Sequence, residues 1–132
     1  MKRMILAAAL AAAPLSVQAQ DAQGLWQSQP GEEGNYIHVQ IAPCQGATDQ
    51  RCGVIRGAFQ ADGTPTNADI VGKPIIWGME PNGSASWNNG TIWAPDQDKE
   101  YRSTMQLQGA DALEVSGCVL FICRSQTWTR IN

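Results

Sequence analysis

From residue 23 onward, the chain is a succession of short segments in which apolar and polar residues alternate, separated by glycine, proline, asparagine and aspartate. Side chains of a β-strand point alternately to its two faces, so this pattern is typical of strands with one buried face. No long stretch carries the period of an amphipathic helix. The pattern predicts these strands: 23–28, 35–42, 52–60, 73–80, 84–93, 100–108, 113–117 and 122–131.

Most of these strands are joined by short turns, of which Pro81-Asn82-Gly83-Ser84 is a strong hairpin signal because asparagine and glycine tolerate positive φ. The exception is a polar loop over residues 61–72. Consecutive hairpins make an antiparallel up-and-down meander, and a meander of about eight strands loses its exposed edges by closing into a barrel. We therefore expect an all-β barrel, with a flattened sandwich as the alternative. A barrel of this size is either filled by side chains or holds one small ligand.

The N-terminus has the pattern of an export signal. Lys2 and Arg3 precede the apolar run 4–13, and small side chains lead to Ala19. This predicts a signal peptide over residues 1–19 and a single domain over residues 20–132 in the periplasm or secreted medium. The run is shorter than the roughly 20 residues of a membrane span, which disfavours an uncleaved anchor. No cysteine near the cut offers a lipid attachment site.

Charge narrows the class of partner. The chain after residue 19 carries 7 basic and 12 acidic residues, a net charge of −5. Nucleic-acid binding needs a basic patch to neutralise phosphate, and the sequence has no cluster of lysine and arginine. The same acidity disfavours electrostatic docking on anionic lipid. We expect a monomer without a membrane anchor after cleavage.

The four cysteines, Cys44, Cys52, Cys118 and Cys123, predict two disulfides, since their number is even and the compartment is oxidising. Three pairings are open. We favour Cys44–Cys52 and Cys118–Cys123, because each pair brackets a short turn between predicted strands. The spacings differ from those of zinc sites, so we expect no metal and no cofactor.

Several segments resemble the bacterial exported family called domain of unknown function 2147, over about residues 24–130. They are CGVIRG (52–57), GKPIIWGMEP (72–81), WNNGTIWAPDQDKEYRSTMQL (87–107) and LEVSGCVLFICRSQTWTR (113–130). The resemblance implies a lipocalin-like barrel and no assigned activity. Asp98 stands where we expect the family to have a turn glycine, and Trp93 where we expect a tyrosine.

The two ends of the domain resemble the closure of lipocalin-type barrels. Gly24-Leu25-Trp26 is similar to the Gly-x-Trp that opens such barrels, and Arg130 lies on the last predicted strand. The resemblance implies that Arg130 stacks on Trp26. A guanidinium over an indole contributes about 0.5–2 kcal/mol.

The last predicted strand places Arg124, Gln126, Trp128 and Arg130 on one face, which we expect to point into the barrel. One interpretation is a pocket in which Arg124 and Gln126 anchor an anionic or carbonyl-bearing small molecule. The alternative is an internal ion pair, with Glu100, Asp111 or Glu114 as the partner, or an arginine that faces solvent.

Tryptophan is abundant, with five residues: Trp26, Trp77, Trp87, Trp93 and Trp128. Trp87 and Trp93 lie six residues apart on one predicted strand, so we expect them to share a face. Together with Trp128 they would suit a hydrophobic or ring-bearing ligand. The alternative is that the tryptophans fill the core.

Catalytic motifs are weak. His38 is the only histidine, and no Gly-x-Ser-x-Gly turn is present. We expect a non-enzymatic protein of the cell envelope that binds a small molecule in its barrel. A protein-interaction module acting through loops 61–72 and 94–99 is an alternative, and a hydrolase that uses carboxylates without histidine is another.

Overall fold

The computed structural model describes residues 21–66 and 68–132. The expected signal peptide, residues 1–19, lies outside these described residues. The strands are β1 (Gly24–Gln27), β2 (Tyr36–Cys44), β3 (Ala47–Phe59), β4 (Pro65–Thr66), β5 (Pro74–Pro81), β6 (Ser86–Ala94), β7 (Lys99–Gln108), β8 (Ala112–Val119) and β9 (Ile122–Arg130). No helix in the described part of the chain is long and apolar enough to cross a membrane.

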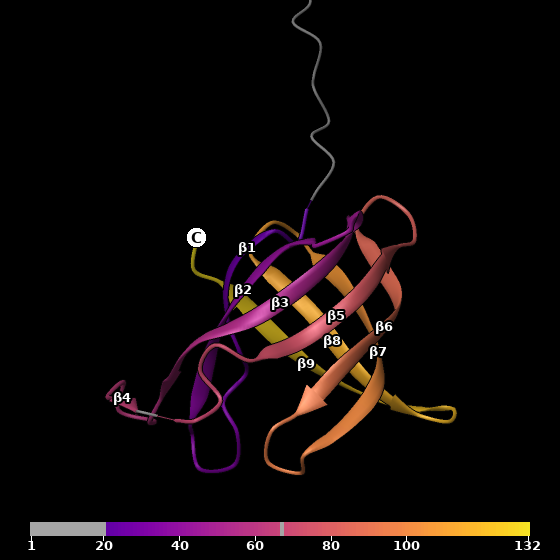
Figure 1. Cartoon of the computed structure of the whole chain (residues 1–132). Coiled ribbons are helices and arrows are strands. Elements are labelled where there is room, and N and C mark those ends of the chain that lie inside the picture. The colour runs from indigo at the N-terminus through magenta and orange to yellow at the C-terminus, as the bar shows by residue number, and fades with distance from the viewer. Residues whose placement is uncertain (1–20, 67) are drawn as a thin grey trace, which may run out of the picture.

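Eight of these strands form a closed antiparallel barrel (Figure 1). Each long strand pairs with its neighbour in sequence, and β1 pairs with both β2 and β9, so the last strand returns to the first. The two-residue strand β4 adds to the outer end of β3. The predicted all-β meander and its closure into a barrel are confirmed. Closure leaves no long sheet edge unpaired among the barrel strands.

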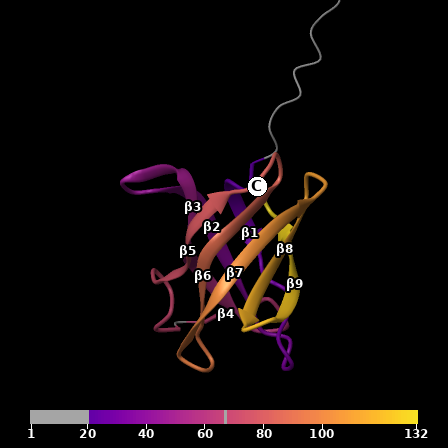
Figure 2. The same cartoon turned by 90° about the vertical axis from the view of Figure 1, so that its right-hand side faces the viewer.

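The predicted strands match the observed ones closely except at β3, which begins at Ala47 rather than at Cys52. Gly46 has a φ of 78°, so the chain reverses within the tight turn Gln45–Gly46 and pairs again at once. The segment between the first two cysteines is therefore a β-hairpin, which projects sideways from the barrel (Figure 2). Sequence reasoning missed it because residues 48–51 are all polar and give no apolar face to recognise.

The barrel interior is filled by one continuous cluster of apolar side chains. Its members, which come from all eight barrel strands, include Trp26, Val39, Ile41, Ile55, Ile76, Met79, Trp87, Ile92, Met105, Leu107, Leu113, Val115 and Trp128. Gly53 allows this packing, because a Cβ there would lie 2.8 Å from Cγ1 of Ile76 and 2.9 Å from Cγ1 of Val39. The interior is thus a packed core.

Candidate functional site

The inward face of β9 does not form the pocket that its sequence pattern suggested. Trp128 is 1% exposed, and its Nε1 donates a hydrogen bond to Oε1 of Gln126 at 2.8 Å. Gln126 is half-buried and opposes Val115 on β8. The amide oxygen of Gln126 therefore already accepts a hydrogen bond from Trp128 and is not left open for a ligand.

The two arginines of β9 have different environments. Arg124 is exposed to solvent. Arg130 lies over the ring of Trp26, with its Cζ 4.3 Å from the ring centroid, and donates to the backbone oxygens of Asp21, Gln23 and Ala110. Neither arginine pairs with the carboxylates that the ion-pair interpretation named, since the one ion pair among the described residues is formed elsewhere.

The prediction that Trp87 and Trp93 share a face is wrong. A β-bulge shifts the register of β6 between Trp87 and Gly90, and Asn89 adopts a φ of 57°. The extra residue reverses the alternation of faces. Trp87 therefore points into the core opposite Met105, whereas Trp93 lies opposite Glu100 on the outer face.

The outer face of the barrel carries a groove of about 720 Å³. A second cavity, of about 300 Å³, is bordered mainly by polar side chains of β6–β8. The groove runs across β2, β3, β5 and β6 and is mostly apolar, with two indoles as its largest side chains. Residues that form its walls include Ala42, Pro43, Val54, Pro74, Trp77 and Trp93, together with the Cys44–Cys52 disulfide.

Trp93 is held in place on both sides. Its Nε1 donates to Oδ1 of Asp98 at 3.0 Å, and Nζ of Lys73 lies 5.6 Å from its ring centroid. Asp98 has a φ of 51° in the β6–β7 turn, a conformation that glycine adopts more easily. The two residues that depart from the expected family pattern are thus bonded to each other, and the unusual aspartate positions the unusual tryptophan.

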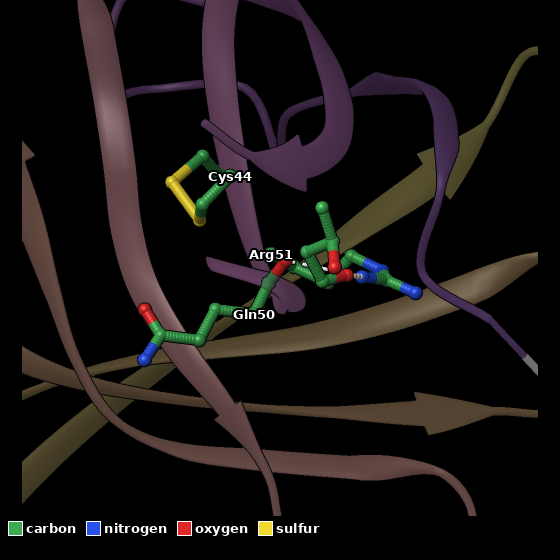
Figure 3. The surroundings of a disulfide bond; sticks show 5 residues. Cys44, Gln50 and Arg51 are labelled. Carbon is green, nitrogen blue, oxygen red and sulfur yellow. Dashed lines mark hydrogen bonds between the residues drawn. A yellow bond between two sulfur atoms is a disulfide. The ribbon is translucent and has the colours of Figure 1, made fainter. Parts of the chain in front are cut away.

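The hairpin of β2 and β3 forms another wall of the groove, and it is fixed at two points (Figure 3). The Cys44–Cys52 disulfide links its strands across a Cα–Cα distance of 5.0 Å. Arg51 donates from Nε and from a terminal nitrogen to the two carboxylate oxygens of Asp21, at 2.9 and 3.0 Å. The hydrogen bond from Arg51, more than its charge, holds the pKa of Asp21 below its ordinary value.

Charged side chains border this apolar groove. Arg56 and Lys73 contribute two cations to its lining, and Glu100, opposite Trp93, contributes one carboxylate. Two cations against one anion favour an anionic group on a bound molecule. Among residues 21–66 and 68–132, no three histidine, cysteine or acidic side chains lie close enough together to hold a metal ion.

His38 lies apart from this groove's lining, on the outer face of β2. Its ring is 4.4 Å from that of Phe59, and Nε2 is 3.1 Å from Oε1 of Gln27. Burial lowers the pKa of His38, so the imidazole is neutral at neutral pH. The contacts of this neutral ring, with the aromatic ring of Phe59 and the amide of Gln27, are those of a residue that packs within the fold.

The cysteines are paired as we favoured, Cys44 with Cys52 and Cys118 with Cys123. Disulfides of this kind are typical of proteins in oxidising compartments outside the cytoplasm. Sequence reasoning missed Trp77, Lys73 and Arg56 as groove residues. Trp77 lies on the outer face of β5, and the bulge in β6 brings Trp93 to the same outer face.

Comparisons with known proteins agree with this fold. None of the curated proteins matches the chain. A solved structure, protein HP1028 from Helicobacter pylori, described as belonging to the lipocalin family, superimposes with a TM-score of 0.66 at 13% identity, covering 85% of this chain and 84% of that one. This similarity shows a lipocalin-like fold. A family model described as an uncharacterized protein conserved in bacteria matches residues 24–130. The chain therefore belongs to that bacterial family, domain of unknown function 2147.

Proposed function

We propose that this protein is a non-enzymatic carrier of the bacterial cell envelope that binds a small, ring-bearing, anionic molecule in the outer groove rather than inside the barrel. The observation that carries the proposal is the pair of indoles, Trp77 and Trp93, in an apolar groove of about 720 Å³. Grooves of this size, apolar with a few polar groups at the border, are typical of small-molecule sites.

The lipocalin-like fold supports binding as the class of function, and the packed interior supports the outer face as its place. Aromatic side chains provide flat surfaces on which a ring stacks. Lys73, whose Nζ lies 5.6 Å from the ring centroid of Trp93, and Arg56 both border the groove, so two cations are available to an anionic substituent of a bound ring. The two disulfides and the sequence of residues 1–19 support a location outside the cytoplasm.

The direct test is a fluorescence titration with 8-anilinonaphthalene-1-sulfonate, an aromatic probe that carries a sulfonate. We expect saturable binding by the folded protein and a loss of about tenfold in affinity for Trp93→Ala or Trp77→Ala, because each substitution removes one stacking surface. Lys73→Gln is expected to weaken binding of the sulfonate by about threefold.

Two matched variants serve as controls. Tyr36→Ala removes an aromatic side chain that stacks on Phe59 on the outer face, away from the groove. Lys99→Gln removes an exposed lysine of β7 that does not border the groove. Both are expected to bind the probe as the unchanged protein does. Equal affinity for Trp93→Ala and Tyr36→Ala would contradict the proposed site.

A further inference from the structure

The β8–β9 hairpin ends in four consecutive apolar residues that the fold leaves in solvent. Val119 is 55% exposed, Leu120 82% and Ile122 71%, and Phe121 is fully exposed. Elsewhere in the described chain the exposed large apolar side chains are single residues, Val71 and Ile131. Contiguous exposed apolar surface of this kind marks a contact with another molecule or a membrane.

This tip is a tight turn closed by a disulfide. Val119 opposes Ile122, so the turn consists of Leu120 and Phe121 alone, and the Cys118–Cys123 disulfide closes the next pair of positions. Leu120 has a φ of 54°, a conformation in which glycine or asparagine is usual. Neither the apolar side chains nor this backbone conformation helps the isolated fold.

Positive charge lies at a defined distance behind the tip. Arg124 is three residues from Phe121, which corresponds to about 10 Å along a strand. Arg102 opposes Cys118 on the neighbouring strand β7. Both side chains are exposed. Since the one ion pair in the described ranges joins Asp21 to Arg51, these two guanidinium groups are free to meet phosphate.

We propose that the β8–β9 tip, residues 119–122, inserts into the headgroup region of a phospholipid bilayer, with Arg102 and Arg124 at the depth of the lipid phosphates. Interfacial segments bury apolar side chains about 5–10 Å below the headgroups, which matches the separation between Phe121 and Arg124. The paired strands satisfy most backbone groups of the inserted segment, as a bilayer requires.

A bilayer fits this tip better than a protein partner does. The tip is narrow and convex, with four apolar side chains, whereas a stable protein interface buries about 800 Å² on each partner. Lipid accommodates a convex tip without a complementary shape. In Figure 1 the hairpin projects sideways, away from the β6–β7 turn that carries Asp96 and Asp98. A tilted barrel therefore inserts the tip while these carboxylates stay in water.

The driving force is apolar, so the net acidity of the chain does not prevent it. The net charge of the chain disfavoured electrostatic docking on anionic lipid. That argument describes the whole surface on average and does not describe one apolar tip. The tip and Arg124 lie in a segment, residues 115–132, that contains no aspartate or glutamate, whereas Arg102 has Glu100 two residues away on the same exposed face of β7. This inference is independent of the groove, because no residue of the tip borders that cavity.

The test is sedimentation of the purified protein, with both disulfides formed, with phosphatidylcholine vesicles. We expect co-sedimentation that persists in high salt, and a partition coefficient about tenfold lower for the double variant Leu120→Ser/Phe121→Ser, because exposed apolar area drives insertion. Ile131→Ser, which removes an exposed apolar side chain outside the tip, is the control and is expected to partition normally.

A second measurement reports depth. Phe121→Trp places an indole at the tip, and its emission is expected to shift to the blue and to be quenched by brominated lipid, beyond the signal of the five native tryptophans. Added phosphatidylglycerol is expected to strengthen binding, and Arg124→Gln is expected to remove part of that gain. Failure of the unchanged protein to sediment with either vesicle, or equal sedimentation of the double serine variant, overturns the proposal and leaves a protein partner for the tip.

Discussion

The five tryptophans divide between two regions of the molecule that use the same side chain in opposite ways. Trp26, Trp87 and Trp128 point into the barrel and are at most 6% exposed. Trp77 and Trp93 lie in the outer groove and are half-buried. Two of the interior indoles donate a hydrogen bond from Nε1 to the protein, Trp26 to the backbone oxygen of Ala22 and Trp128 to Oε1 of Gln126. The outer pair keeps part of its indole surface open in the groove. We therefore expect the interior indoles to contribute to stability and the outer pair to contribute to binding.

The largest effect is expected from removing an interior indole. Trp128→Ala should lower the free energy of unfolding by about 3–5 kcal/mol, since it leaves a large cavity in a packed core. Trp93→Ala should lower it by only about 1–2 kcal/mol, because this side chain is half-buried. Urea denaturation of both variants measures the difference. Similar losses for the two would break the division between interior and groove.

The two disulfides separate binding from stability in another way. Each disulfide closes a short hairpin. Replacing both cysteines of either pair, Cys44–Cys52 or Cys118–Cys123, by serine should therefore lower the free energy of unfolding by about 2–3 kcal/mol. Only the first pair lines the groove. We therefore expect the Cys44→Ser/Cys52→Ser variant alone to lose affinity for the naphthalene sulfonate probe, measured by titration well below its unfolding temperature. Unchanged affinity would show that this wall is dispensable.

Asp98 offers a finer test, because its turn conformation and its hydrogen bond to Trp93 can be separated. Asp98→Gly suits the φ of 51° but removes the acceptor, so the probe affinity should fall about threefold with little change in stability. Asp98→Asn keeps an acceptor oxygen and tolerates positive φ. It should bind almost normally in the same titration. Normal binding by Asp98→Gly would mean that Trp93 needs no positioning.

The smallest effect concerns the ion pair that fixes the hairpin. Arg51 lowers the pKa of Asp21 in the folded state, so this pair stabilises fully above the ordinary carboxyl value near 3.8 and is lost as pH falls through the lower folded value. Asp21→Asn should cost about 1 kcal/mol or less at neutral pH, since the carboxylate is 39% exposed. Its deficit relative to the unchanged protein should vanish in acid. A deficit that stays constant down to pH 2 would contradict this assignment.

The sequence predicts the barrel well because the alternating pattern and the short turns are local signals. Most strands lie within a few residues of their expected bounds, and the cysteine pairs follow from the turns they bracket. The position of the candidate site could not be predicted in the same way. One extra residue at Asn89 turns Trp93 from the interior to the outer face, and alternation alone does not reveal a bulge.

The second failure concerns what fills the barrel. A sequence of alternating residues shows which face a side chain occupies but gives no volume, so a hollow and a packed interior have the same pattern. Trp128 and Gln126 face inward as expected, yet their mutual hydrogen bond makes them part of the packing. Arg124 belongs to the same face and is nevertheless exposed. The position of each residue along β9, rather than the face it occupies, decides whether its side chain is buried or exposed.

The most direct measurement uses the five indole N–H groups as separate reporters in a nitrogen–proton NMR correlation spectrum. During titration with the naphthalene sulfonate probe, we predict that the resonances of Trp77 and Trp93 shift progressively, while those of Trp26, Trp87 and Trp128 stay in place. Shifts confined to the three interior indoles would contradict the account, because they would place the ligand inside the barrel.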